Sequence, residues 1–357
     1  MKHPKLFIPG PVEVATDVLE CLRTPMIGHR TSEYSRLQER VTAKVQELMY
    51  TDNVVVFSAS SGTGLMEMAL RSTTKKRAVV FSVGAFGNRW FDIAKANGMA
   101  ADKHELEWGE GLTPEIVDTY LSTGKYDVAT VTHNETSTGV MNNLAELEQV
   151  FKRYPEVIWC VDAVSSLGGV KIPVDAFGID ICVSSSQKAL GLPPGLSLAS
   201  VSDKALQKAK GVSERGYYFD LLLLVKYIRE RDYQYPSTPA LPHMFALDFQ
   251  TDRILAEGLE QRFARHKALA TLAREWTQCY FALFPRVAFA SDTVTCVRNT
   301  REISVQKLND ELVRRGFQIS NGYGALKEKT FRIAHMGDVL PEELTQLLCT
   351  IDEILGL

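Results

Sequence analysis

The order of secondary-structure signals is the feature that most constrains how this chain can fold. From Thr51 to about Val201, short β-branched runs alternate with helix-like stretches, which is typical of a mostly parallel sheet with crossover helices. Runs such as Val157–Val161 are apolar throughout, as expected for strands of a sheet that helices cover on both faces. The predicted strands are Val54–Ser58, Ala78–Ser82, Asp127–Thr132, Val157–Asp162, Asp180–Ser184 and Ser197–Val201.

The pattern changes beyond about Ala246. A long helical stretch runs through Phe281, and short strands then alternate with helices without any low-complexity linker. The elements expected there are strands Val294–Val297 and Thr330–Ala334 and helices Ser304–Arg315 and Pro341–Ile354. We therefore predict a large α/β domain over residues 1–256, with the N-terminal segment included, and a small C-terminal α/β domain over residues 257–357.

Charge and cysteine usage exclude several classes of function. The 357 residues carry 40 Lys and Arg against 43 Asp and Glu, and no long run of one sign offers a footprint for nucleic acid or an anionic membrane. The six cysteines are scattered, with no C-x-x-C pair or Cys/His cluster, so neither a metal site nor a disulfide framework is expected. The expected partners are therefore small molecules and copies of the same chain.

A cytoplasmic location is expected. No stretch reaches the ~18 apolar residues of a membrane span, and the start Met1-Lys2-His3-Pro4-Lys5 lacks the apolar run of a signal peptide. Cys160 and Cys182 lie in apolar runs, where a thiol behaves as a small buried hydrophobe.

Three strand ends carry polar residues, and in such sheets ligands collect at the carboxyl ends of the strands. The first of these ends is Ser60-Ser61-Gly62-Thr63-Gly64, directly before a helical pattern. Glycine lets the backbone approach an anion, hydroxyls add donors, and the free N–H groups of a helix start favour negative charge, so a phosphate fits there. Ordinary helix capping by these small residues is the alternative. The dinucleotide fingerprint G-x-G-x-x-G is absent.

The second strand end is Asp162, which follows an apolar run and is expected to be partly desolvated. A buried carboxylate needs a partner, and a protonated pyridine nitrogen would be one, because an ionised acid there keeps the ring cationic. Capping of a helix that starts at Ala163 is the alternative.

The third strand end leads into Lys188, which is flanked by hydroxyls and followed by the flexible segment Gly191-Leu192-Pro193-Pro194-Gly195. A lysine at the mouth of a sheet can act as a Schiff-base nucleophile if burial or a nearby cation lowers its pKa from about 10.4. Most lysines are solvated surface charges. Here a phosphate loop, an acid and a lysine fall on strand ends of one sheet, as a single pyridoxal-5′-phosphate (PLP) site requires.

Three further segments carry a family resemblance: Ser186-Gln187-Lys188-Ala189-Leu190 with Pro193-Pro194-Gly195, His133-Asn134-Glu135-Thr136-Ser137-Thr138-Gly139, and Pro9-Gly10-Pro11. With these the chain resembles class V aminotransferases of the alanine–glyoxylate and serine–pyruvate group over nearly its whole length. The resemblance implies a PLP-dependent transferase of fold type I, with a mostly parallel seven-stranded sheet in the large domain. It also implies a homodimer.

The resemblance assigns roles position by position. Lys188 becomes the Schiff-base residue and Asp162 the partner of the pyridine nitrogen. Phe86 takes the place of the aromatic ring, often Trp, that lies on the cofactor. The remaining cofactor residues implied by the resemblance are Ser61, Gly62, Thr63 and Gln187 at the phosphate, Thr136 at the ring hydroxyl, Val164 beneath the ring, and Tyr235 and Thr238, which reach the phosphate of the neighbouring subunit.

Substrate contacts follow from the same resemblance. Arg332 matches the arginine that grips the substrate carboxylate, and a guanidinium fork suits that role because it can form a bidentate pair. Gly28, His29 and Arg30 match a segment at the substrate mouth, where a solvated loop is the alternative.

The expected reaction is transamination between a small L-amino acid, alanine or serine, and a 2-oxo acid, glyoxylate or pyruvate. Lys188 would act as general base and acid. The alternatives are an aspartate or other dicarboxylate aminotransferase, for which Arg30 could supply a second cation, and a cysteine desulfurase-like lyase. Against the lyase, the loop Asn321–Lys329 carries no cysteine. A nucleotide-binding or structural protein would leave Lys188, Asp162 and Arg332 without a joint explanation.

Overall fold

The larger part of the fold is built on a seven-stranded sheet. The computed structural model describes residues 3–357. Met1 and Lys2, part of the start that was expected to lack a signal peptide, lie outside the described residues. The strands lie in the order β2-β10-β9-β8-β5-β3-β4, and all neighbours are parallel except β10, which is antiparallel to both β2 and β9. This confirms the expected mostly parallel sheet. The strands are β2 (Val54–Ser58), β3 (Ala78–Ser82), β4 (Ala101–Glu105), β5 (Val128–Thr132), β8 (Ile158–Asp162), β9 (Ile181–Ser185) and β10 (Ser197–Val201).

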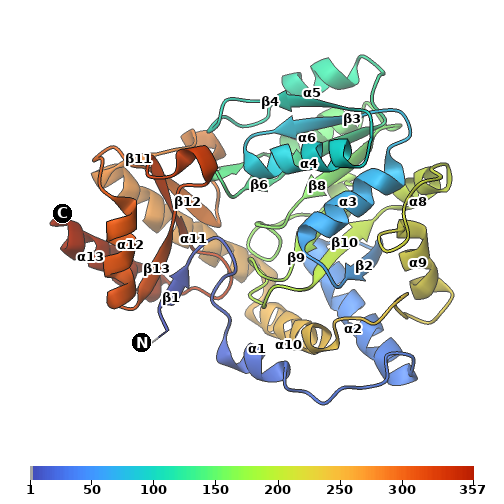
Figure 1. Cartoon of the computed structure of the whole chain (residues 1–357), viewed down its shortest axis with the longest axis horizontal. Coiled ribbons are helices and arrows are strands. Elements are labelled where there is room, and N and C mark those ends of the chain that lie inside the picture. Colours follow the sequence, from blue (N-terminus) through green and yellow to red (C-terminus); the bar gives the residue numbers. More distant parts are fainter. Residues whose placement is uncertain (1–2) are drawn as a thin grey trace.

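Helices flank this sheet and connect its strands (Figure 1). The helix α3 packs on β9 and β10, and α4 packs on β3 and β5, so apolar strands are buried between helical layers. The helices of this part are α1 (Thr16–Cys21), α2 (Ser32–Met49), α3 (Gly62–Thr73), α4 (Ala85–Ala96), α5 (Pro114–Leu121), α6 (Leu144–Phe151), α7 (Val174–Phe177), α8 (Asp203–Lys210), α9 (Leu221–Arg229) and α10 (Leu241–Glu257). A two-stranded hairpin, β6 (Asn134–Glu135) with β7 (Val140–Met141), follows β5.

The smaller part is a five-stranded sheet in the order β1-β13-β14-β12-β11. Figure 1 shows it at the orange and red end of the chain, with the blue N-terminal strand beside it. Its strands are β1 (Lys5–Phe7), β11 (Ala282–Leu283), β12 (Val294–Arg298), β13 (Phe317–Asn321) and β14 (Thr330–Ala334). The helices around it are α11 (Leu259–Tyr280), α12 (Val305–Arg314) and α13 (Pro341–Leu355), and 3-10 turns lie at Val287–Phe289 and Gly324–Leu326.

The N-terminal strand departs from the predicted division of the chain. β1 pairs in parallel with β13, with Lys5 opposite Phe317, so residues 5–7 belong to the small sheet and not to the large domain. Phe7 is fully buried in the same apolar cluster as side chains of α11, α12, β14 and α13. A three-residue strand is too short to show a pattern in the sequence, so the burial of Phe7 in this cluster could not be predicted. The boundary at 256/257 stays a prediction.

The long helical stretch expected through Phe281 is two helices. Gly258 adopts φ +85°, a positive value that glycine reaches without strain, and it separates α10 from α11. None of the helices within residues 3–357 is both long enough and apolar enough to cross a membrane.

Candidate active site

A cavity of about 260 Å³ opens at the carboxyl ends of β2, β8 and β9. Its wall includes the residues predicted to bind the cofactor ring and phosphate within one chain, namely Ser61, Gly62, Thr63, Phe86, Thr136, Asp162, Val164, Gln187 and Lys188. The structure therefore brings together the three strand ends that the sequence singled out. Residues that sequence reasoning did not assign also line the cavity: Gly10, Pro11, Met66, Arg89, Asn134, Ser165, Ser185 and Pro194.

Lys188 lies three residues beyond β9 and is half-buried. Its Nζ donates a hydrogen bond to the carbonyl of Pro9, and its chain runs so close to Gly10 that a Cβ there would lie 2.7 Å from Cε. Burial, with the nearby charge of Arg332, lowers the pKa of Lys188 to about 8, while Asp162 opposes the shift. A substantial fraction of the amine is therefore uncharged in mildly alkaline solution, as a nucleophile or proton acceptor requires.

Asp162 ends β8 and is 5% exposed. Burial, together with the charge of Glu135, raises its pKa to about 6, against a hydrogen bond from the backbone N–H of Val164 (2.9 Å). No helix starts at Ala163, so the capping alternative is wrong: the segment after Asp162 forms turns. Within residues 3–357 no basic side chain forms an ion pair with this carboxyl, and a cationic partner in the cavity would complete it.

The opposite end of the cavity is built to receive an anion. Ser61 occupies the N-cap of α3, yet its side chain makes no capping hydrogen bond, so the first N–H groups of the helix are not satisfied by it. A Cβ on Gly62 would lie 2.6 Å from Cγ2 of Val164, so only glycine lets the helix start come this close. The hydroxyl of Ser185 and Oε1 of Gln187 are buried and have no hydrogen-bond partner among the described residues.

Arg89 adds positive charge at this end. Its Nη1 donates to Oγ1 of Thr63 (3.2 Å), and its guanidinium lies 4.7 Å from the ring centroid of Phe86. No carboxylate in residues 3–357 forms an ion pair with it. Arg89 follows Phe86 by three residues at the start of α4, a helical spacing that places both on one face and that could have indicated this role.

Phe86 is held by a buried acid that sequence reasoning did not assign. Glu135 is 0% exposed, and its carboxylate accepts hydrogen bonds from the N–H groups of Phe86 (2.9 Å) and Gly87 (3.0 Å). Ser137 donates to it through its N–H and its hydroxyl. Burial raises the pKa of Glu135 against these four donors. The acid therefore fixes the first turn of α4, and with it the ring predicted to lie on the cofactor.

Thr136 and Val164 complete the wall near Asp162. The hydroxyl of Thr136 is hydrogen-bonded to that of Ser165, so one of the two protons remains available to a ligand.

Arg332 lies on β14, beside the cavity but not in its wall. It is 8% exposed and donates to the carbonyl oxygens of Thr136 (3.2 Å) and Asn321 (3.0 and 3.2 Å). Burial lowers its pKa. Its positive charge contributes to the lowered pKa of Lys188, which is compatible with a carboxylate bound between the two cations.

The remaining predicted residues do not reach the cavity of their own chain. Tyr235 is buried elsewhere, with its hydroxyl 3.5 Å from that of Tyr218, and Thr238 is exposed. Gly28 and His29 lie in the loop between α1 and α2. Arg30 donates to the carbonyls of Tyr235 and Pro236, not into the cavity.

Comparisons with known proteins show which family the chain resembles along its length. The chain matches the family described as Aminotransferase class-V over residues 21–324. An uncharacterized aminotransferase of Methanocaldococcus jannaschii is 38% identical over 97% of this chain and 91% of that protein. An L-aspartate–glyoxylate aminotransferase of Paracoccus denitrificans is 31% identical over 94% and 86%. A serine–glyoxylate aminotransferase of Arabidopsis thaliana is 30% identical over 98% and 90%.

Among solved structures, an alanine–glyoxylate aminotransferase from Nostoc sp. superposes with a TM-score of 0.93 at 26% identity, covering 99% of this chain and 96% of that one.

Proposed function

Because this chain belongs to the class V aminotransferase family, we propose that it uses PLP at the cavity around Lys188 to transfer an amino group from alanine or serine to glyoxylate or pyruvate. The observation that carries the proposal is that Lys188 and Asp162 line the same cavity. The pKa of the lysine is lowered and that of the acid is raised, each shift arising first from burial. Strongly shifted pKa values of buried groups that share one cavity are typical of functional sites.

The residues present fit PLP. Asp162 would pair with the ring nitrogen, and the helix start at Ser61–Thr63 with Ser185 and Gln187 would hold the phosphate. When bound, PLP withdraws electrons from the α-carbon of the amino acid. Phe86 and Val164 would enclose the ring.

In this mechanism Lys188 has two tasks. Its amine would hold the cofactor until an amino acid binds. The free amine would then accept the proton from the α-carbon of the substrate and later give it back as an acid, which its lowered pKa allows near neutral pH. Arg332 would hold the substrate carboxylate so that the α-carbon lies within reach of Lys188. The second half of the cycle runs the same steps in reverse with a 2-oxo acid.

A substrate with a short side chain is favoured because Arg332 is the cation that these contacts leave to bind a substrate carboxylate. Arg30 is engaged with the carbonyls of Tyr235 and Pro236, and Arg89 with Thr63 at the phosphate end. A distal carboxylate buried without a cation would cost several kcal/mol. The names of the relatives support glyoxylate as acceptor, with serine, alanine or aspartate as donor.

The test is a comparison of kcat/KM for alanine, serine and aspartate, with glyoxylate and with pyruvate, in wild type, Arg30→Ala and Arg89→Gln. We expect alanine or serine to be preferred, and Arg30→Ala to leave the ratio of alanine to aspartate unchanged. A preference for aspartate in wild type would replace the small-substrate proposal. Its loss in Arg89→Gln alone would identify the second cation as Arg89, whereas its loss in Arg30→Ala would identify Arg30.

A further inference from the structure

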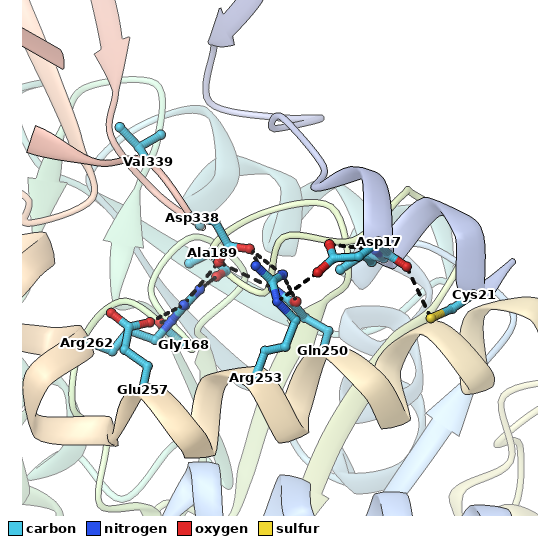
Figure 2. Close-up of polar contacts among 12 residues, drawn as sticks. Asp17, Cys21, Gly168, Ala189, Gln250, Arg253, Glu257, Arg262, Asp338 and Val339 are labelled. Carbon is cyan, nitrogen blue, oxygen red and sulfur yellow. Dashed lines mark hydrogen bonds and ion pairs between the residues drawn. The ribbon is translucent and has the colours of Figure 1, made fainter. Parts of the chain in front are cut away.

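A single buried guanidinium, that of Arg262, contacts the chain segments that follow Lys188, Asp162 and Arg332. Arg262 of α11 is 1% exposed. Its Nε donates to the carbonyl of Gly168 (2.7 Å) and its Nη2 to the carbonyl of Ala189 (3.0 Å). Its Nη1 contacts the carboxylates of Glu257 (2.8 Å) and Asp338 (3.1 Å). Figure 2 shows these bonds converging between the helices and the loop that carries Asp338.

The partners of Arg262 stand in a simple relation to the active site. Ala189 directly follows Lys188 in the chain. Gly168 lies six residues after Asp162, on the loop that leaves β8, and Asp338 lies six residues after Arg332, on the loop that leaves β14. Arg262 therefore joins the segments of the amine, the ring-nitrogen acid and the substrate arginine, which come from two different sheets.

Asp338 extends the network to α10 and the N-terminal part. It also accepts hydrogen bonds from Gln250 (3.2 Å) and Arg253 (2.9 Å), and Arg253 reaches Asp17 of α1 (3.4 Å). Burial alone would raise the pKa of Asp338, but the charge of Arg262 and the other donors hold it below its usual value. The carboxylate is therefore ionised, and the buried Arg262 has the counter-charges that make its burial tolerable.

The turn that carries Lys188 is held on its other side by the N-terminal segment. The N–H of Val12 donates to the carbonyl of Gln187 (3.1 Å), and Nζ of Lys188 contacts Pro9. Within the turn, the N–H of Gly191 donates to the carbonyl of Lys188 (2.8 Å). The bond from Arg262 to Ala189 is thus a side-chain anchor placed one residue from the reacting amine.

We propose that Arg262, with Asp338 as its counter-charge, is a positioning residue that keeps Lys188, Asp162 and Arg332 in register for transamination. The inference rests on the proposed function. Register matters because a displacement of about 1 Å between reacting groups can lower a rate roughly 100-fold. A residue that only stabilised the fold would leave the properties of the bound cofactor unchanged.

The experiment compares the PLP-loaded wild type with Arg262→Lys, Arg262→Gln and Asp338→Asn. Arg274→Lys is the matched control because Arg274 lies on the same helix. Its guanidinium likewise donates to two backbone carbonyls, of Ala290 and Ser291, and to the carboxylate of Asp292. Three quantities are measured: the Tm, kcat and KM for the amino donor, and the pH midpoint of the visible absorbance of bound PLP.

We expect Arg262→Gln and Asp338→Asn to lower kcat/KM by roughly 10- to 100-fold and to shift the absorbance midpoint. Arg262→Lys should recover part of the loss, because it keeps the charge but cannot reach all four partners. Arg274→Lys should leave kcat/KM and the absorbance midpoint unchanged, even if it lowers the Tm. Variants with a lowered Tm but unchanged kcat/KM and midpoint would overturn the proposal. If neither Arg262 variant folds, Asp338→Asn decides by the same two readouts.

Failure of the proposed function is distinguishable from failure of this inference. It would be seen in the wild type itself, as absent cofactor absorbance or no amino transfer with any donor, whereas the positioning role is judged only by differences between an active wild type and its variants.

Discussion

Lys188 contributes chemistry and little to the apolar core. Its amine contacts one backbone carbonyl and forms no ion pair in residues 3–357. We therefore expect Lys188→Ala to fold with a Tm near that of wild type and to lose turnover almost completely. Steady-state rates and thermal unfolding check this. More than a few per cent of the wild-type rate, without added amine, would exclude Lys188 as the reacting amine.

The acid at the end of β8 gives the site a pH dependence of its own. The pKa of Asp162 is raised to about 6, so its negative charge is present above pH 6 and is lost as the pH falls through 6, where an ordinary Asp would still be charged. A cationic ring nitrogen needs that charge. Wild type should therefore bind PLP more tightly than Asp162→Asn at pH 8, and the advantage should begin to fall as the pH drops below 6.

The measurement is the Kd for PLP across this pH range in both proteins. The amide variant serves as the control for the titration of the cofactor itself, because both proteins share that titration. A constant ratio of the two Kd values from pH 8 to 5 would mean that Asp162 is not the titrating partner.

How much of the site the sequence predicts differs from residue to residue. Asp162 was found because a polar group directly after an apolar strand is visible in the pattern, and Lys188 because a lysine follows a cluster of hydroxyls at the next strand end. Family resemblance then gave Arg332 a role that its short strand alone would not. Arg89 and Ser185 were not found. Ser185 reaches the cavity only through the folded position of β9, and the spacing of Arg89 from Phe86 indicates a shared helix face but not that this face borders the cavity.

At the scale of elements, the first turn of α4 depends on Glu135. Glu135→Ala would leave the N–H groups of Phe86 and Gly87 and the hydroxyl of Ser137 without their acceptor inside the protein. Buried donors without partners cost about 1–3 kcal/mol. We expect a loss of ~2 kcal/mol in the free energy of unfolding.

Urea denaturation of Glu135→Ala and Glu135→Gln measures this effect. The glutamine variant keeps one acceptor oxygen, so its loss should be smaller. Equal stabilities of both variants and wild type would show that the α4 start does not depend on the carboxylate.

Strands covered on both faces are easier to predict from the sequence than a strand at the edge of the sheet. β2, β3 and β10 begin and end where the pattern of apolar residues predicted, because each is covered on both faces. β4, with the sequence Ala-Asp-Lys-His-Glu, was not among the predicted strands. It lies at the edge, pairs only with β3 and keeps polar side chains partly exposed, so no apolar run marks it.

On the scale of the whole molecule, the segment Tyr235–Thr238 predicts an assembly of two chains. It does not reach the cavity of its own chain, and Thr238 is exposed. If this segment completes the phosphate site of a second copy, dissociation should weaken PLP binding. We expect sedimentation to show a dimer, and Thr238→Ala to raise the Kd for PLP without changing the dimer. A fully active monomer that keeps its cofactor would contradict the shared site.

The pairing of β1 with β13 has a consequence for the order in which the protein is made. Residues 5–7 leave the ribosome long before their partner strand, residues 317–321. At synthesis rates of about 5–20 residues per second, the N-terminal strand waits on the order of tens of seconds for its neighbour. Pro9 and Val12, just beyond this strand, contact Lys188 and Gln187, so we expect the reactive lysine to be enclosed only after β13 has anchored the N-terminal segment. A nascent chain stalled before β13 should therefore expose that lysine to labelling.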